Sequence, residues 1–416
     1  MKIQLNSEVD RLRSVLVHTP GIEMENMTPD SAPEVLYDDI LSLPLASKEH
    51  AQLTGVLSQV AEVYELKPLL TDVLADATVK QALLEDIVAL YRCPDYLDRL
   101  MPLAPSLLAA QLIEGTPKVT TSLERFLDPS PYVIPPLPNT FFTRDATMCL
   151  NDRIIIGSMA YRARVAESLL LKSIFNHHPK IEANGFYFDG TVHQDSKITI
   201  EGGDLLVVRE DVVLIGYSER TSVVAIDHLM KSIAKQGPVR HFIVVEIPQS
   251  RATIHLDMLF TLVDFDRCVV FPPMIEGTHS APAYHCFFDD SNLDEIHAIT
   301  EYPQVLAAAR AVGIDLNPIP CGGDQRFHQE REQWASGANF FTFAPGQVLG
   351  YAHNEHTIAA MQAAGFNVAH ASEVINGERP IDPAEKILVT MDGAELSRGG
   401  GGCRCMTMPL ARQPSG

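Results

Sequence analysis

Residues 154–164 read Ile-Ile-Ile-Gly-Ser-Met-Ala-Tyr-Arg-Ala-Arg, a short β-branched strand that leads through a polar turn into a helix-like run. The same order recurs at residues 212–220, Val-Val-Leu-Ile-Gly-Tyr-Ser-Glu-Arg, and at residues 348–354, Val-Leu-Gly-Tyr-Ala-His-Asn. Two more strand-like stretches, at residues 14–17 and 268–271, complete a set of five. Recurrence at such a period indicates a repeat architecture. We therefore predict an α/β fold of five β-rich modules around a centre, with helices outside.

A helical pattern interrupts this repeat. From Ser47 to about Leu112, apolar residues recur at spacings of three and four, as on one face of a helix. We expect residues 47–125 to form a mainly helical insertion, and residues 1–46 and 126–416 to form the repeated α/β unit. An open doubly wound sheet is the alternative, but that fold usually has a Gly-rich phosphate turn near its start. No such turn is present in the sequence.

Composition narrows the class of partner. The chain has 416 residues, of which 46% are hydrophobic, and a formal net charge of −21. This charge disfavours nucleic acids and acidic membranes, which select basic surfaces. We therefore expect a small-molecule partner, no nucleic acid and no membrane. Seven cysteines without a framework spacing, no leader-like N-terminus and no long apolar run suggest the cytoplasm.

A glycine loop ends in a thiol at residues 397–409, Ser-Arg-Gly-Gly-Gly-Gly-Cys-Arg-Cys-Met-Thr-Met-Pro. Glycines let a backbone approach a ligand closely. A linker or frayed tail is the alternative, but strand-like residues 386–391 precede the loop and apolar residues 406–410 follow it. A phosphate-binding loop is disfavoured, because no Lys-Ser/Thr pair follows the glycines. We interpret the loop as a functional site.

Three short blocks before this loop place acids beside strand-like residues, at 139–145, 201–204 and 255–257. A cysteine nucleophile needs a proton shuttle and groups that hold the electrophile in line. His255 offers the shuttle, and Glu201 is suited to orient its imidazole, as the third member of a catalytic triad does. Asp145 and Asp257 then remain as a pair of carboxylates. Such a pair repels unless a planar cation lies between them, and a guanidinium fits.

With these residues in view, the chain resembles the bacterial arginine deiminases of the guanidine-modifying enzyme superfamily over nearly its full length. The resemblance runs through Phe142-Thr143-Arg144-Asp145, Glu201-Gly202-Gly203-Asp204, His255-Leu256-Asp257, Cys321-Gly322-Gly323, Arg331-Glu332-Gln333-Trp334, Ala344-Pro345-Gly346 and Arg404-Cys405-Met406-Thr407-Met408-Pro409. It implies a five-bladed pseudo-symmetric α/β propeller with an inserted small helical domain. It also implies hydrolysis of L-arginine to L-citrulline and ammonia without a cofactor.

The resemblance further implies a role for each matching residue. Cys405 is expected to be the nucleophile, with His255 as general acid and base and Glu201 as its partner. Asp145 and Asp257 are expected to bind the guanidinium. Positions that contact the amino-acid end of the substrate in this family hold Asn139, Phe142, Arg164 and Arg220. The family also suggests a homodimer or homotetramer.

One position departs from the family pattern. Many members carry an arginine five residues before the nucleophile, where this chain has Gly400, while Arg398 and Arg404 remain. We therefore expect Arg398 to be a substrate contact. Cys403 and Cys405 form a Cys-x-Cys pair, but a zinc site needs about four ligands and no Cys/His cluster accompanies them. No metal is expected.

Two other functions remain open. A hydrolase or amidinotransferase acting on another guanidino compound is one, because the change at Gly400 concerns substrate selection. A binding protein without catalytic activity is the other, and it is disfavoured by the presence of the complete set of expected catalytic residues.

Overall fold

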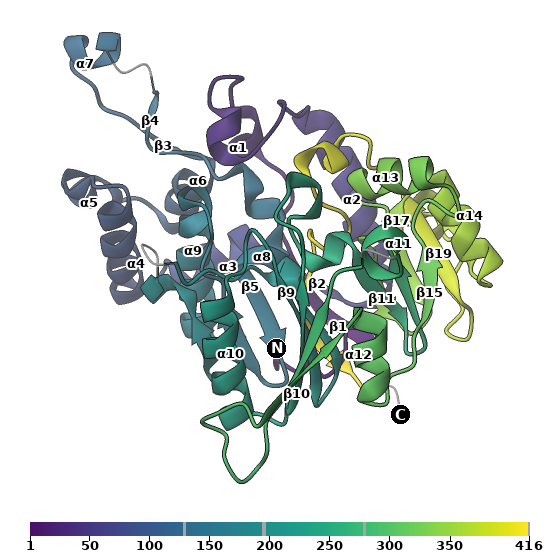
Figure 1. Cartoon of the computed structure of the whole chain (residues 1–416). Helices are drawn as coiled ribbons and strands as arrows, with labels where there is room; N and C mark the ends of the chain where they lie inside the picture. The colour runs from purple at the N-terminus through teal and green to yellow at the C-terminus, as the bar shows by residue number, and fades with distance from the viewer. Residues whose placement is uncertain (128–129, 194–196, 278–279, 415–416) are drawn as a thin grey trace.

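The computed structural model describes residues 1–127, 130–193, 197–277 and 280–414. Within these residues the strands form five larger sheets and one two-stranded ribbon, and helices surround the sheets (Figure 1). The predicted α/β fold is therefore confirmed. The arrangement of the sheets as propeller blades stays a prediction.

The sheets contain the following strands. The first has β1 (Arg11–Val17), β2 (Glu62–Glu65) and β20 (Met408–Gln413). The second has β5 (Thr147–Leu150), β6 (Arg153–Ile156) and β7 (Phe186–Asp189). The third has β8 (Leu205–Arg209), β9 (Val212–Tyr217), β10 (His241–Glu246), β13 (Ala283–Phe287) and β14 (Ala298–Tyr302). The fourth has β11 (Phe260–Asp264), β12 (Arg267–Val270) and β15 (Asn317–Pro320). The fifth has β16 (Phe341–Ala344), β17 (Gln347–Tyr351), β18 (Asn367–His370) and β19 (Ile387–Met391), and the ribbon has β3 (Thr116–Pro117) and β4 (Tyr132–Ile134).

All five sheets repeat one pairing plan. The strands β1, β6, β9, β12 and β17 each have one antiparallel and one parallel neighbour. These five are the strands predicted from the sequence, and their apolar side chains are buried. A strand that is covered on both faces needs such a continuous run of Val, Ile and Leu. The repeat predicted from the sequence is therefore confirmed at the level of the strands.

Helices supply the crossover connections that parallel pairing requires. These are α2 (Leu43–Val60), α9 (Val165–His177), α10 (Val223–Gln236), α12 (Val305–Ala311), α14 (Glu355–Ala363) and α15 (Ala371–Ile375). In α10 the side chain of Ser222 caps the N-terminus by accepting a hydrogen bond from the backbone N–H of Ala225. Ile226, Leu229 and Ile233 form its buried stripe.

The first sheet includes part of residues 47–125, the segment predicted to be a mainly helical insertion. The strand β2 lies parallel to β1, and α2 connects the two, so both elements complete the first sheet. The helices that follow are α3 (Leu66–Val73), α4 (Ala77–Leu90), α5 (Leu97–Leu100) and α6 (Pro105–Glu114). Of these, α3 and α4 pack against α9, to one side of the sheets (Figure 1). The helices that pack against α9 thus follow β2, and the bounds of the helical insertion stay a prediction.

The remaining helices lie in the connections between these elements. The α-helices are α1 (Ile22–Glu25), α7 (Ser122–Leu127), α8 (Thr143–Ala146), α11 (Pro272–Ile275) and α13 (Arg326–Trp334). The 3-10 helices are η1 (Ala32–Val35), η2 (Pro94–Tyr96), η3 (Pro138–Phe141), η4 (Arg162–Arg164), η5 (Gly190–His193), η6 (Gly202–Asp204), η7 (Arg251–Thr253), η8 (Leu256–Met258) and η9 (Leu396–Gly399). None of the helices in the described ranges has the length and apolar character needed to cross a membrane.

Short turns in front of the sheets position the site. The segments α8, η6 and η8 directly precede β5, β8 and β11, and the glycine loop after η9 precedes β20. The segment η6 contacts both α8 and η8. Elsewhere β20 contacts β5, and β16 contacts both β1 and β11. The sheets thus meet either through these strands or through the turns in front of them, which brings the turns together.

Candidate active site

A cavity of about 350 Å³ opens among these turns. Its walls include eight of the ten residues predicted to form the site, namely Asn139, Phe142, Asp145, Arg164, Arg220, His255, Arg398 and Cys405. Glu201 and Asp257 lie behind the wall, fully buried. The structure therefore gathers in one place residues that the sequence separates by up to 266 positions, from Asn139 to Cys405.

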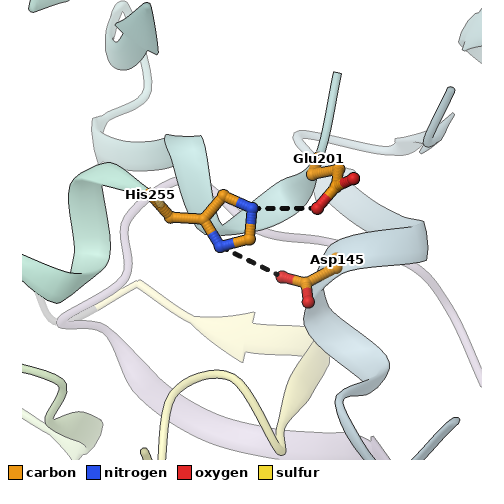
Figure 2. Close-up of side chains that lie close together, drawn as sticks. All are labelled: Asp145, Glu201 and His255. Atoms are coloured by element: carbon orange, nitrogen blue, oxygen red, sulfur yellow. Dashed lines mark hydrogen bonds and ion pairs between the residues drawn. The ribbon is translucent and has the colours of Figure 1, made fainter. Parts of the chain in front are cut away.

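The imidazole of His255 lies between two carboxylates (Figure 2). Its Nε2 is 3.0 Å from Oε2 of Glu201, and its Nδ1 is 3.8 Å from Oδ1 of Asp145. Burial disfavours the charged ring, but Asp145 and the hydrogen bond with Glu201 outweigh burial and raise the pKa of His255 to about 9. His255 is therefore an imidazolium at neutral pH and can donate a proton.

Residues 201–204, Glu-Gly-Gly-Asp, pack closely around the imidazole of His255. A Cβ atom on Gly203 would lie 2.4 Å from Nδ1 of His255, so only glycine leaves room for the imidazole. Burial opposes the charge of Glu201, but Arg220 and His255 lower the pKa of this carboxyl to about 2. Asp204 fixes the backbone of the next block by accepting a hydrogen bond from the N–H of Leu256 at 2.8 Å.

The thiol of Cys405 lies 3.7 Å from Oδ2 of Asp257 and is almost wholly buried. Burial, and then the charges of Asp257 and Asp145, raise the pKa of this thiol well above its usual range. A nucleophilic cysteine is expected to have a lowered pKa or a nearby base. Burial and the two carboxylates instead favour the neutral thiol of Cys405, and a cation entering the cavity would favour the thiolate.

Each of the paired carboxylates already contacts an arginine of the chain. Oδ2 of Asp145 is 2.7 Å from NH1 of Arg164, and Oδ2 of Asp257 is 2.8 Å from NH1 of Arg404. The other oxygen of each group, Oδ1, is buried and has no hydrogen-bond partner among the described residues. Each aspartate therefore retains one oxygen that accepts no hydrogen bond from the described residues, although Oδ1 of Asp145 also faces Nδ1 of His255 at 3.8 Å.

The two arginines expected at the amino-acid end of the substrate differ in their contacts. Arg164 also binds Glu167 at 2.8 Å and the carbonyl oxygen of Phe142 at 3.4 Å. Arg220 donates to Glu201 at 3.3 Å and lies over the ring of Tyr161, with 4.6 Å from Cζ to the ring centroid. The Nε of Arg220 is buried, and no residue in the described ranges accepts a hydrogen bond from it. Arg220 thus has a donor available for a ligand.

The remaining predicted contacts lie at the cavity wall and its mouth. Asn139 is buried and donates to the carbonyl oxygen of Val35 at 2.8 Å. Phe142 packs against the glycine loop, where a Cβ on Gly401 would lie 2.5 Å from its ring. Arg398 lies at the mouth and is paired with Glu395 at 3.0 Å and with Asp39.

Gly400 has an unusual backbone conformation, and the space around its Cβ position is empty of other described residues. Its φ is +88°, in the left-handed region that favours glycine. Apart from its two chain neighbours, no heavy atom of the described residues would lie within 4 Å of a Cβ atom there. In this structure the guanidinium of Arg398 is held by the two acids at the mouth, and its role as a substrate contact stays a prediction.

One group in the described part of the chain has the composition of a metal site. Single ligand atoms of Asp145, Glu201 and His255 lie within 4.8 Å of one another. However, NH1 of Arg164 lies 2.7 Å from Asp145 and 3.9 Å from Glu201. This guanidinium already supplies the positive charge that the acids require. The prediction that the site needs no metal stays a prediction.

Sequence reasoning missed Asn339. Its Oδ1 accepts hydrogen bonds from the backbone N–H groups of Arg404 at 3.0 Å and Cys405 at 3.3 Å, and its Nδ2 donates to the carbonyl oxygen of Asp257 at 3.1 Å. Asn339 precedes β16 as Asp145, Asp257 and Cys405 precede their own strands. A search for polar residues just before the first strand of each repeat would have identified it.

Comparison with known proteins places the chain among guanidine-modifying enzymes. Residues 33–412 match the family described as "Arginine deiminase". The chain is 32% identical over 431 residues to an arginine deiminase of Bacillus cereus (strain ATCC 10987 / NRS 248), and this similarity covers 99% of the chain and 98% of that protein.

Solved structures with a similar fold have lower sequence identity. SxtG, an amidinotransferase from Microseira wollei, has a TM-score of 0.53 and 15% identity, covering 99% of this chain and 98% of that one. AgrE, in a ternary complex with ornithine and NAD+, has a TM-score of 0.52 and 12% identity over 97% of this chain. The chain spans only 40% of AgrE. At these identities the likeness concerns the fold.

Proposed function

Because the chain belongs to the arginine deiminase family, we propose that it hydrolyses L-arginine to L-citrulline and ammonia through a thiouronium intermediate on Cys405. The observation that carries this proposal is the pair of free acceptors near the thiol. Oδ1 of Asp145 and Oδ1 of Asp257 are buried and accept no hydrogen bond in the described structure. Buried acceptors without partners are costly, and the N–H groups of a guanidinium would satisfy both.

Substrate binding also activates the nucleophile in this proposal. The cationic guanidinium offsets the two carboxylates that raise the pKa of Cys405. The thiol then loses its proton to solvent, while His255 stays protonated because its pKa is about 9. The site holds a thiolate and an imidazolium before the chemical step begins.

The first half of the reaction forms the covalent intermediate. The thiolate attacks the guanidinium carbon and gives a neutral tetrahedral adduct. His255 donates its proton to one amino group, which departs as ammonia and leaves a cationic thiouronium on Cys405. Covalent catalysis divides one difficult displacement into two easier steps.

The second half releases the product. The now neutral His255 takes a proton from water, and the resulting hydroxide adds to the thiouronium carbon. The C–S bond breaks, the thiolate leaves, and the hydroxyl proton is lost to solvent as the ureido group of citrulline forms. Glu201 keeps the imidazole of His255 oriented through both steps. Its hydrogen bond with Nε2 holds the ring so that Nδ1 faces Asp145.

At the other end of the substrate, Arg220 is proposed to bind the carboxylate. Its unpartnered Nε and the stacking of its guanidinium on Tyr161 support this role within the described residues. Arg164 is proposed to hold Asp145 in place, since its donors already contact Asp145, Glu167 and Phe142. Asn139 and Phe142 complete the wall.

A panel of substrates tests the function. The purified protein is incubated with arginine, agmatine, methylated arginines and simple guanidino acids, and ureido product and ammonia are both measured. Equal amounts of citrulline and ammonia from arginine, with little turnover of agmatine, are expected. Transfer to an amine acceptor without ammonia would identify an amidinotransferase, and no turnover of any compound would identify a binding protein.

The finer features of the fold are also proposals. We infer that the five sheets are the blades of a five-bladed propeller, supported by their common pairing plan and by the contacts among the strands and turns of successive sheets. We propose that the helical domain spans residues 66–125. All seven cysteines are free, which supports a cytoplasmic location. A homodimer or homotetramer is expected, and light scattering after size-exclusion chromatography tests it.

A further inference from the structure

A chain of buried charges links the N-terminal segment to the proposed site. Oε2 of Glu8 lies 2.9 Å from Nε of Arg404, and Oε1 lies 2.5 Å from NH2 of the same guanidinium. Both side chains are buried. The contact joins residues 396 positions apart, and the proposed reaction steps do not use Glu8.

Arg404, which pairs with Glu8, also binds Asp257. Its NH1 donates to Oδ2 of Asp257 at 2.8 Å, and its NH2 also donates to the carbonyl oxygen of Leu205 at 2.7 Å. The guanidinium is therefore held from two sides and reaches only one oxygen of Asp257. The second oxygen, Oδ1, is the buried acceptor proposed for the substrate.

The backbone around Glu8 is fixed by neighbouring sheets. The N–H of Glu8 donates to the carbonyl oxygen of Val207 at 2.8 Å, and the hydroxyl of Ser7 donates to that of Val208 at 2.8 Å. Leu5 pairs with Asn151, in the turn between β5 and β6 of the second sheet. The carboxylate of Glu8 is thus placed by the fold and not by Arg404 alone.

The charge of Glu8 is needed in this position. Burial opposes it, but Arg404 and Arg144 outweigh burial and lower the pKa of Glu8 to about 2. Arg144 lies 3.6 Å away, and Arg412 also faces the cluster. Without this carboxylate, Arg404 and Arg144 would both lose a buried negative partner.

We propose that Glu8 is a positioning residue that restricts Arg404 to one oxygen of Asp257 and so keeps the other free for the guanidinium of the substrate. A guanidinium beside a carboxylate prefers a two-pronged contact. Without Glu8, Arg404 is free to turn and occupy both oxygens of Asp257. The proposal rests on the proposed function, since it concerns the carboxylate that binds the guanidinium.

The test compares Glu8→Gln with a matched control, Glu332→Gln. Glu332 is also buried and accepts hydrogen bonds from the backbone N–H groups of His356 and Thr357, away from the Arg404 cluster. Glu8→Gln is expected to lower kcat/KM for arginine by about 10- to 100-fold, the scale of a charge-assisted contact. Glu332→Gln should stay within about threefold, because distant sites act independently.

Two measurements separate positioning from general damage. The first is arginine binding in a Cys405→Ser background, followed by the fluorescence of Trp334, which lines the cavity and is the single tryptophan of the chain. Glu8→Gln, Asp257→Asn and their combination are compared, with thermal unfolding as a check that each variant is folded. If Glu8 acts through Asp257, the double variant should bind arginine no more weakly than Asp257→Asn alone.

The second measurement needs no turnover. Cys405 faces the charges of Asp257, Asp145, Arg404 and Arg144. Loss of the negative charge of Glu8 leaves more positive charge on the arginines near Cys405, which favours the thiolate. Alkylation of Cys405 by iodoacetamide should therefore become faster at neutral pH, while turnover of arginine falls. Peptide mass spectrometry measures the alkylation rate. Unfolding would instead expose all the buried cysteines.

The outcomes distinguish the two proposals. Additive binding losses, or equal turnover in Glu8→Gln and Glu332→Gln, would overturn the role of Glu8. If Glu8→Gln does not fold, Glu8→Asp replaces it, because this variant retains the charge on a shorter side chain. Changes in turnover, binding and alkylation in the same direction, but smaller, are then expected. If the unmodified protein does not hydrolyse arginine, the proposed function fails, and the alkylation rate still tests the link from Glu8 to Cys405.

Discussion

Nε2 of His255 and Oε2 of Glu201 lie 3.0 Å apart in a buried pair at the wall of the cavity. This contact and the nearby charge of Asp145 raise the pKa of His255 to about 9. A histidine with an ordinary pKa would be mostly neutral at about pH 7.5 and would be a poor source of the proton that ammonia needs. The pair therefore sets the pH range in which the ring can act first as an acid.

Replacement of Glu201 by Gln should move the alkaline limb of the pH profile. The raised pKa keeps His255 protonated up to about pH 9, and loss of the carboxylate lowers that pKa, so protonation is lost at a lower pH. We expect the limb of kcat/KM for arginine to shift toward acid by about one pH unit or more. Steady-state rates across the acid and alkaline limbs measure it. An unmoved limb would mean that another group donates the proton.

Replacement of Asp257 by Asn should cost about 3 kcal/mol or more in transition-state stabilisation, because both Arg404 and the substrate lose a buried negative partner. Folding should survive, as judged by thermal unfolding. Asp264→Asn is the matched control, since Asp264 is a buried acid that pairs with Lys386 at 2.6 Å, outside the cavity wall. Near-normal kcat/KM in the Asp257 variant would make this residue structural.

Replacement of Arg398 by Ala should have a small effect. Its side chain is 41% exposed and already pairs with Glu395 and Asp39, and exposed pairs contribute only about 0–1 kcal/mol. We therefore expect KM for arginine to rise less than about fivefold. A larger rise for arginine but not for agmatine would restore Arg398 as the carboxylate contact inferred from the sequence.

The position of Gly400 is tested separately by Gly400→Arg. The positive φ of this residue disfavours an arginine, so a loss of stability of about 1 kcal/mol is expected. The open space around its Cβ position lets the new side chain extend without a clash. Higher kcat/KM for arginine with lower activity on another guanidino compound would show that arginine is not the natural substrate.

Much of the fold is predictable from local pattern. The runs at Ile154–Ile156 and Val212–Ile215 are β-branched or apolar throughout, which is typical of central strands, and their side chains are buried. The strand β2 was not predictable in this way. Val60 and Val63 are three residues apart, as on a helix, yet Val63 lies in β2 and pairs with Val15. Long-range pairing overrode the local spacing.

The residues of the candidate site, too, were predictable only in part. The chemistry of His255, Glu201 and Cys405 is visible as residue types, and the family resemblance assigned their roles. The contacts of Glu8 and Asn339 with the loop around Cys405 are not visible, because they depend on how distant segments lie beside one another. The residue types alone also gave no sign that Arg164 and Arg404 would each occupy one oxygen of the paired aspartates.

Covalent catalysis by Cys405 is tested most directly by rapid acid quenching of the protein with excess arginine, followed by mass spectrometry of the peptide that contains Cys405. We predict a transient adduct on Cys405 with the mass of one arginine less one ammonia. Cys403, which is buried with its Sγ 3.6 Å from Sδ of Met391, should carry none, and Cys403→Ser should still form the adduct. Full turnover in a Cys405→Ser variant, or an adduct on Cys403 instead, would contradict this mechanism.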